Sequence, residues 1–308
     1  MTKKTFTFQS SNGKNTIAGM MWLPDYAPRA ILQISHGMME YIERYQDFAA
    51  FLVGHGILVV GNDHLGHGGS VEDADGYGYF GGRDGGHFVV EDLCHLTRFI
   101  KNEYPDIPYF LLGHSMGSFM ARRYVMGYGN QIDGVIIMGT GQQNIAMVRM
   151  GKILIALVRA LRGDHHRSKL LDRAMFGNYD KKIVKKRTGY DWLTTDEKVV
   201  DQYAADPRCT FLFTTNGNLG LMNTILYIRK KKHICKVPKK LPMLIVAGKE
   251  DPVGGYGRDV EKYYSEMCAY GMKDIKCHIY DGMRHEILNE TDRMQVYEDI
   301  LNWLENRI

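Results

Sequence analysis

The residue best placed to do chemistry is Ser115, within the Gly-His-Ser-Met-Gly stretch at residues 113–117. An apolar run at 109–112 precedes this stretch and a helical pattern follows it, which is the strand, G-x-S-x-G, helix order of a nucleophile elbow. Such a turn lifts the serine hydroxyl above the edge of a sheet, and its glycines remove Cβ atoms that would collide there. We therefore predict that Ser115 is a nucleophile.

A serine hydroxyl becomes a good nucleophile when a histidine, held by a carboxylate, takes its proton. In this architecture the chain order is serine, acid, histidine, and each residue follows a strand. Asp251 follows the apolar run 241–247, and His285 follows the run 275–280. We predict Asp251 as the acid and His285 as the base, with the adjacent Glu250 as a weaker alternative for the acid.

The negative oxygen of a tetrahedral intermediate needs two hydrogen-bond donors. We expect these to be the backbone N–H groups of Met116, directly after the nucleophile, and of Met38, in the loop after the early apolar run 30–35. His64 and His67 have a spacing that suits a metal, but glycines surround them, so we expect a structural loop beneath the site. No metal site and no cofactor is predicted.

The composition is that of an ordinary globular protein, with 308 residues of which 44% are hydrophobic and 24% charged. A net charge of +4 gives little reason to expect nucleic acid as a partner. The five cysteines form no C-x-x-C pair, which indicates neither a disulfide framework nor zinc and favours a reducing, cytoplasmic location. We see no signal peptide after Met1, and the apolar run 153–158 is too short to span a bilayer.

The elements that must position these residues alternate between apolar strand-like runs and helical patterns, as in a parallel sheet covered on both faces. We expect strands at 4–9, 16–23, 30–35, 57–61, 109–112, 133–138, 241–247 and 275–280 and helices at 45–55, 87–104, 257–270 and 293–307. Residues 142–236 break this rhythm with helical patterns at 147–161, 196–203 and 219–229. They predict a helical cap inserted between two parts of the core, 1–141 and 237–308.

Together the motifs resemble the monoacylglycerol lipase and lysophospholipase branch of the α/β-hydrolase superfamily, whose members are also described as serine aminopeptidase S33-like or Hydrolase_4. The resemblance covers 1–140 and 240–308 and is carried by His36-Gly37-Met38-Met39-Glu40, Arg44-Tyr45, the Asp-His-Leu-Gly-His-Gly-Gly-Ser loop at 63–70, the elbow, Asp251 and His285. Residues 192–197, Tyr203 and 206–211 are similar to bacterial members. The resemblance implies an α/β-hydrolase fold with a mostly parallel sheet of about eight strands, helices on both faces and a helical cap insert. It also implies hydrolysis of carboxylic esters of lipids, with medium or long acyl chains, through an acyl-enzyme on Ser115.

Two departures from the family pattern concern the size of the substrate. Met38 and Met39 stand where small residues are common, and Ser118 stands where a second glycine is common. We expect the substrate to contact Gly37, Met39, Glu40, Ile153 and Leu157. The apolar residues near 153–161 could line an acyl tunnel, contact a membrane surface or pack against the core. The basic runs 181–187 and 230–232 could attract anionic lipid or be ordinary solvated faces.

Other functions fit parts of the pattern. A carboxylesterase or thioesterase for smaller acyl groups would use the same three residues. An S33-type aminopeptidase ranks lower, because no acidic site for a substrate amino terminus is recognisable at 142–236. A non-catalytic ligand-binding protein of this fold would be expected to lack one of Ser115, Asp251 and His285, and all three are present.

Overall fold

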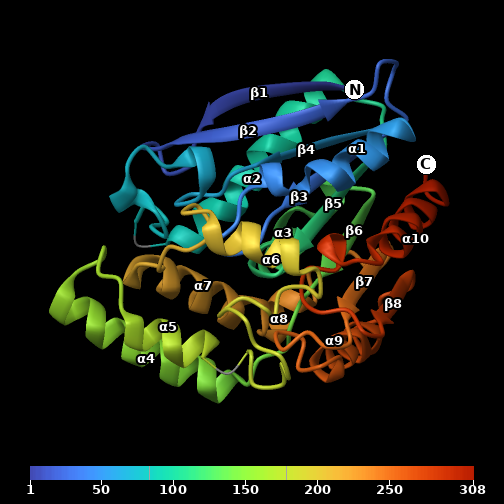
Figure 1. Cartoon of the computed structure of the whole chain (residues 1–308). Coiled ribbons are helices and arrows are strands. Elements are labelled where there is room, and N and C mark those ends of the chain that lie inside the picture. The colour runs from blue at the N-terminus through green and yellow to red at the C-terminus, as the bar shows by residue number, and fades with distance from the viewer. Residues whose placement is uncertain (83, 178) are drawn as a thin grey trace.

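The computed structural model describes residues 1–82, 84–177 and 179–308, and a single eight-stranded sheet runs through it in the order β1-β2-β4-β3-β5-β6-β7-β8 (Figure 1). The strands are β1 (Thr2–Gln9), β2 (Thr16–Leu23), β3 (Ala30–Ser35), β4 (Ile57–Asn62), β5 (Tyr109–His114), β6 (Gly134–Met138), β7 (Met243–Gly248) and β8 (Ile275–Tyr280). β1 and β2 form an antiparallel hairpin, and β2 pairs antiparallel with β4. From β4 to β8 all pairs are parallel, so the carboxyl ends of six strands lie at one edge.

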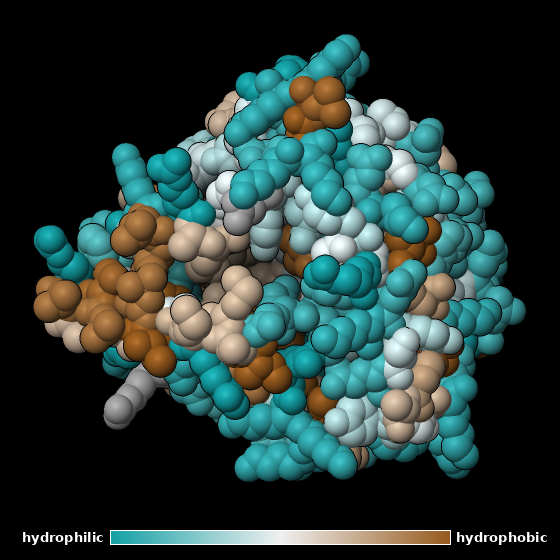
Figure 2. Space-filling model, turned by 90° about the horizontal axis from the view of Figure 1, so that it is seen from below, coloured by the Kyte–Doolittle hydropathy of each residue, from teal (hydrophilic) through white to brown (hydrophobic). Residues whose placement is uncertain are grey.

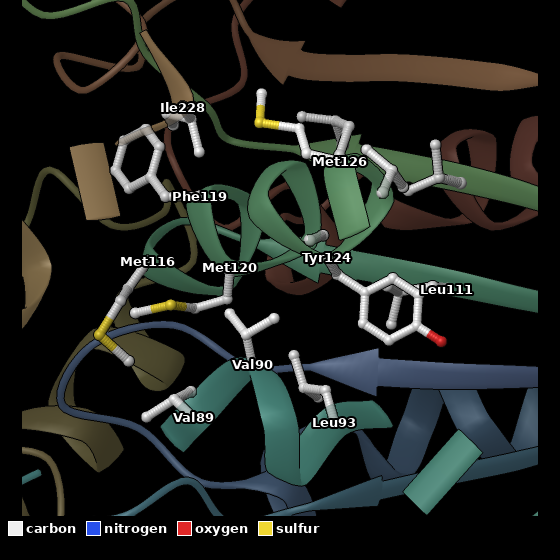
Figure 3. Packing of buried hydrophobic residues seen from close by; sticks show 14 of the residues in the cluster. Val89, Val90, Leu93, Leu111, Met116, Phe119, Met120, Tyr124, Met126 and Ile228 are labelled. Carbon is white, nitrogen blue, oxygen red and sulfur yellow. The ribbon is translucent and has the colours of Figure 1, made fainter. Parts of the chain in front are cut away.

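Helices cover both faces of this sheet. α1 (Gln46–Gly54) and α10 (Arg293–Glu305) pack on one face, and α2 (Gly85–Glu103), α3 (Met116–Tyr128) and α9 (Arg258–Ala269) pack on the other. Strands β3 to β7 are buried along their whole length, which explains their continuous apolar runs. Figure 3 shows Met116 and Met120 of α3 facing Val89 and Val90 of α2. The predicted α/β-hydrolase fold is confirmed.

Between β6 and β7 the chain forms helices instead of further strands. These are α4 (Ile145–Arg162), α5 (Lys169–Phe176), α6 (Glu197–Ala205), α7 (Thr215–Ile228) and α8 (Lys231–Ile234). α7 packs against α2 and α3 of the core on one side and against α4 on the other, so α4 lies further from the sheet (Figure 1). The boundaries proposed for a cap at 142–236 stay a prediction.

Two features of this segment differ from the expectations. α5 was not predicted at all. α7 begins four residues before the expected position 219, because the hydroxyl of Thr214 accepts a hydrogen bond from the backbone N–H of Gly217 at 3.1 Å and so caps the helix there. Among the described helices, none combines the length and the apolar character needed to cross a membrane.

Short 3-10 helices complete the described elements. They are η1 (Ile42–Tyr45), η2 (Gly68–Ser70), η3 (Ala74–Gly76), η4 (Gly129–Gln131) and η5 (Ile287–Asn289). η1 and η2 follow β3 and β4, and η5 follows β8. These three lie in loops at the carboxyl edge of the sheet, where the predicted site residues are found.

Candidate active site

Ser115 lies in a strained turn between β5 and α3. Its backbone has φ 53° and ψ −118°, a conformation that costs free energy for a residue with a side chain. The turn is so tight that a Cβ on Gly113 or Gly117 would overlap neighbouring backbone. At Gly117 the overlap would be with the carbonyl oxygen of Ser35. The backbone N–H of Ser115 donates to the carbonyl oxygen of Met138 on β6 at 3.0 Å, which fixes the turn to the sheet.

The structure brings Ser115, His285 and Asp251 together. His285 Nε2 lies 2.8 Å from Ser115 Oγ, and His285 Nδ1 lies 2.9 Å from Asp251 Oδ2. Asp251 is fully buried and His285 is 2% exposed. An imidazole that donates its Nδ1–H to Asp251 leaves Nε2 free to accept the serine proton, which is the tautomer that nucleophile activation needs. Glu250, the alternative acid, points elsewhere: its carboxylate lies 3.9 Å from Arg284.

The loops that carry Asp251 and His285 are held from several sides. The second oxygen of Asp251 accepts a hydrogen bond from the backbone N–H of Val253 at 2.8 Å. Arg284, next to His285, donates to the carbonyl oxygens of Asp191 at 2.6 Å and Thr194 at 2.9 Å. The segment that follows α5 therefore positions the histidine loop as well as covering it.

The loop after β3 lies against the nucleophile. A Cβ built on Gly37 would lie 3.0 Å from Ser115 Cβ, so glycine is needed for this approach. Met39 takes a positive φ of 57°, and its carbonyl oxygen accepts a hydrogen bond from Tyr203 Oη at 2.8 Å. In the part of the chain that the structure describes, the backbone N–H groups of Met38 and Met116 donate to no protein acceptor. Both residues line the same cavity as Ser115.

A buried charged network lies behind this loop. Glu40 Oε1 accepts hydrogen bonds from the Gly37 N–H, from Tyr45 Oη at 3.0 Å and from His114 Nδ1 at 2.9 Å. Arg44 donates to Glu40 Oε2 at 3.1 Å and forms a two-bond pair with Glu286 at 2.7 Å for both contacts. Glu286 directly follows the predicted base, His285, in the sequence.

The ionisation of Glu40 and His114 depends on the charged groups that each one contacts. Burial opposes ionisation of Glu40, but the charge and hydrogen bond of His114, with the charge of Arg44, hold the pKa of Glu40 well below its usual value. Burial likewise opposes the charged form of His114, but Glu40 raises the pKa of that imidazole. Glu40 and His114 thus form an ion pair, and the carboxylate of Glu40 is 3% exposed with both oxygens occupied. Glu40 also lines the cavity at Ser115, so the expected contact with substrate stays a prediction beside this positioning role.

His64 and His67 lie beneath the site. His64 Nε2 lies 3.0 Å from Ser35 Oγ, and the backbone N–H of His64 donates to His36 Nε2 at 2.9 Å. Burial lowers the pKa of His64 to about 3 and that of His67 to about 4, so both imidazoles are neutral. They pack under the loop after β3, as expected for a structural loop.

A mostly apolar cavity of about 420 Å³ opens at Ser115 and His285. The side chains that line it from α3, α4, α5 and α7 include Phe119, Val148, Ile155, Leu171, Leu221, Met222 and Ile225, and Gly151 and Trp192 also contribute. Ile153 and Leu157, which we expected to contact substrate, lie on the outer face of α4 and are 62% and 58% exposed. From α4 the described lining includes Val148, Gly151 and Ile155 but neither Ile153 nor Leu157, so contact of these two residues with substrate stays a prediction.

Comparison with known proteins identifies the group of enzymes this site resembles. The family model Hydrolase_4, described as serine aminopeptidase, S33, matches residues 26–292. The monoacylglycerol lipase of Mycolicibacterium smegmatis is 27% identical over 297 residues, covering 92% of this chain and 91% of that protein. The monoglyceride lipase of Homo sapiens is 26% identical over 291 residues, covering 93% and 86%. The crystal structure of a thermostable carboxyl esterase from Bacillus coagulans in complex with glycerol has a TM-score of 0.92 and 29% identity, covering 100% of this chain and 99% of that one.

Proposed function

The chain belongs to the Hydrolase_4 family, described as serine aminopeptidase, S33, and from this membership and the geometry of the site we propose that it cleaves monoacylglycerols or lysophospholipids. It is a serine ester hydrolase. The observation that supports a lipid substrate is the connected arrangement of Ser115, His285 and Asp251 at the mouth of a mostly apolar cavity of about 420 Å³.

In the proposed reaction Ser115 Oγ attacks the ester carbonyl carbon while His285 Nε2 takes the hydroxyl proton. Asp251 holds the imidazole through Nδ1 and stabilises the imidazolium that forms. The C–O bond to the alcohol then breaks, His285 returns its proton to the leaving alcohol, and the acyl group stays on Ser115. Water, deprotonated by His285, then attacks the acyl carbon. The bond from that carbon to Ser115 Oγ breaks, His285 returns the proton to Ser115 Oγ, and the fatty acid leaves.

The free backbone N–H groups of Met38 and Met116 supply the donors for the oxyanion that forms twice in this cycle. Loss of one such donor typically costs about 3–4 kcal/mol of barrier. Glu40 sets the geometry of the donor loop, because it binds the Gly37 N–H on one side and His114, next to the nucleophile, on the other.

The size and lining of the cavity suit a medium-length acyl chain. A cavity of about 420 Å³ has room for roughly fourteen groups the size of water, at about 30 Å³ each. The lining side chains from α3, α4 and α7 are apolar, so a hydrocarbon chain is favoured there over a polar one. Met39 lines this cavity and Gly37 lies against Ser115, so both would be near the ester.

An exposed apolar face on α4 and α5 supports contact with a lipid surface. We define this face by Met147, Met150, Ile153, Leu157, Leu161 and Leu170, which are all exposed. Figure 2 shows hydrophobic side chains gathered over this part of the molecule, beside a hollow in the surface. Met147 belongs both to this face and to the wall of the cavity, so a substrate in a membrane would have a short apolar route to Ser115.

A substrate panel tests the proposal. Purified protein is assayed on monoacylglycerols and lysophospholipids of increasing chain length, on nitrophenyl and thioester substrates of the same lengths, and on proline amides. We expect the largest kcat/KM for lipid esters with medium or long chains. A maximum for acetyl or butyryl esters would identify a small-ester carboxylesterase or thioesterase instead, and cleavage of proline amides without ester turnover would identify a peptidase.

A further inference from the structure

A second cavity, separate from the one at Ser115, lies between α3, α4 and the end of α7. It has a volume of about 390 Å³. Five cationic side chains line it, namely Arg123, Arg149, Lys152, Arg229 and Lys230, and Asp84 is the one carboxylate among the described residues that do. The cations come from two helices, α3 and α4, and from the α7–α8 turn, so the fold gathers charges that are far apart in the sequence.

These charges are poorly neutralised within the protein. Arg229 Nη1 lies 3.5 Å from Glu266 Oε2, and Arg229 Nε and Nη1 are buried without a hydrogen-bond partner in the part of the chain that the structure describes. Arg123 donates to Thr224 Oγ1 at 3.3 Å and lies over the ring of Tyr227. Within the same described residues, Arg149, Lys152 and Lys230 have no ion pair.

Electrostatics within this cluster are unfavourable for a protein without a ligand. Burial lowers the pKa of Arg123 despite the attraction of Asp84. Burial also lowers the pKa of the neighbouring Arg122, and the charge of Arg229 adds to that effect. Arg123 and Arg229 are half-buried, with Asp84 and Glu266 as nearby carboxylates, and an anion between the cationic side chains would offset part of the cost of burying them.

We propose that this cavity binds a phosphate group. A phosphate offers several acceptor oxygens, and guanidinium groups bind two of them at once in a planar fork. Arg123 comes from the core helix α3 and Arg149 from α4, so one bound phosphate would link the core to the helix that walls the acyl cavity. Ile145, the first residue of α4, also lines the cavity and adds the positive end of that helix.

The phosphate can come from a phospholipid headgroup or from a free phosphate or soluble phosphate ester. The position of the site favours the headgroup, because Arg149 directly precedes Met150 and Lys152 directly precedes Ile153 of the exposed apolar face. The basic cavity thus borders the surface proposed to contact lipid. The binding of phosphate does not depend on hydrolysis, so this inference can fail or hold independently of the proposed function.

The test compares wild type with Arg149→Gln/Lys152→Gln and with a matched control, Lys231→Gln/Lys232→Gln. The control removes the same charge from two exposed lysines of α8, next to the cavity. The first measurement is the thermal unfolding midpoint in sodium phosphate and in sodium chloride of equal ionic strength. We expect phosphate at ten times its dissociation constant to raise the midpoint of wild type and control by about 2 °C. The same addition should leave the midpoint of Arg149→Gln/Lys152→Gln unchanged.

The second measurement distinguishes the two sources. Binding is measured by sedimentation with vesicles of phosphatidylcholine, alone or with one-fifth phosphatidylglycerol. We expect wild type to bind the anionic vesicles and Arg149→Gln/Lys152→Gln to bind them about thirty-fold more weakly. Each basic group near such a surface contributes about a factor of five to the binding constant. Phosphate stabilisation with equal vesicle binding by both double variants would support the site with a soluble ligand. Equal stabilisation of all three proteins by the two salts, or an equal loss of the phosphate-specific stabilisation in both double variants, would overturn the proposed site.

Discussion

Glu40 and His114 form a buried ion pair, with 2.9 Å between Oε1 and Nδ1, that joins the loop carrying Met38 to the turn carrying Ser115. Neither residue touches the ester in the proposed reaction. Each stands beside a residue that does, because Glu40 follows the donor loop and His114 precedes the nucleophile. In the proposed reaction the pair would hold the loop of the proposed oxyanion donor Met38 against the turn that carries Ser115.

Glu40→Gln should be strongly destabilising. It removes the charge that His114 and Arg44 share, so that Arg44 keeps only Glu286 and His114 loses the carboxylate that it contacts. Loss of one member of a buried ion pair costs about 3–5 kcal/mol. Urea unfolding measures this loss. Tyr45→Phe, which removes one neutral donor to the same oxygen, should cost only about 1 kcal/mol. Equal effects of the two substitutions would argue against an ion pair.

The same pair predicts a pH dependence of stability. The folded-state pKa of His114 is raised above 6.5, so its contribution is complete below that pH and is lost as the pH rises through the folded pKa. The folded-state pKa of Glu40 is lowered below 4.5, so its contribution is present above that pH and is lost as the pH falls through the folded pKa. The difference in unfolding free energy between wild type and His114→Gln should be largest between these values and shrink above pH 6.5. In the Glu40→Gln background we expect no such change above neutral pH.

Gly151→Leu should shorten the acyl chains that the enzyme accepts. Gly151 lines the acyl cavity from α4, and nothing lies within 4 Å of a Cβ built there, so a larger side chain would extend into the open space. We expect kcat/KM for long-chain esters to fall by at least about tenfold while acetyl and butyryl esters stay unaffected, since even one excess methylene in a pocket is worth roughly tenfold.

The matched control for this variant is Gly127→Leu, at another open position in the helix α3. Replacing a helical glycine should stabilise both variants by about 0.5–1 kcal/mol, through helix propensity alone. A change in chain-length preference in both variants, or in neither, would contradict the assignment of this cavity to the acyl chain.

Leu157→Glu/Leu161→Glu should separate activity at a lipid surface from activity in solution. Both side chains are exposed on α4, at 58% and 82%, and burying a leucine in an apolar phase contributes roughly 1.5–3 kcal/mol. We expect turnover of monoacylglycerol in vesicles to fall by about a hundredfold and hydrolysis of a soluble nitrophenyl ester to be unchanged. Met294→Glu on α10, also an exposed apolar position, is the control and should affect neither assay.

Chain direction in a parallel sheet made the convergence of Asp251 and His285 on Ser115 predictable from the sequence. Asp251 and His285 each come after an apolar run, and because such runs end at one edge, the structure brings both to Ser115. The faces of the outer helices were harder to predict. α4 is apolar on most of its surface, so the pattern alone could not tell that Ile155 packs inward while Ile153 and Leu157 face solvent.

The charged network could not be predicted from the pattern either. Glu40 and Arg44 have the spacing of an ion pair, but Glu286 reaches Arg44 across 242 residues, and no local signal marks a contact of that kind. Similarly, Arg123, Arg149 and Arg229 resemble separate surface charges in the sequence, and only the fold places them around one cavity.

The most direct test of Ser115 as the nucleophile is covalent labelling with a fluorophosphonate, located by peptide mass spectrometry, in wild type, Ser115→Ala and His285→Ala. We predict one adduct on Ser115 in wild type, none in Ser115→Ala, and labelling slowed by about a thousandfold or more in His285→Ala because the serine loses its base. An adduct on another residue, or ester hydrolysis at the wild-type rate by Ser115→Ala, would contradict the proposed mechanism.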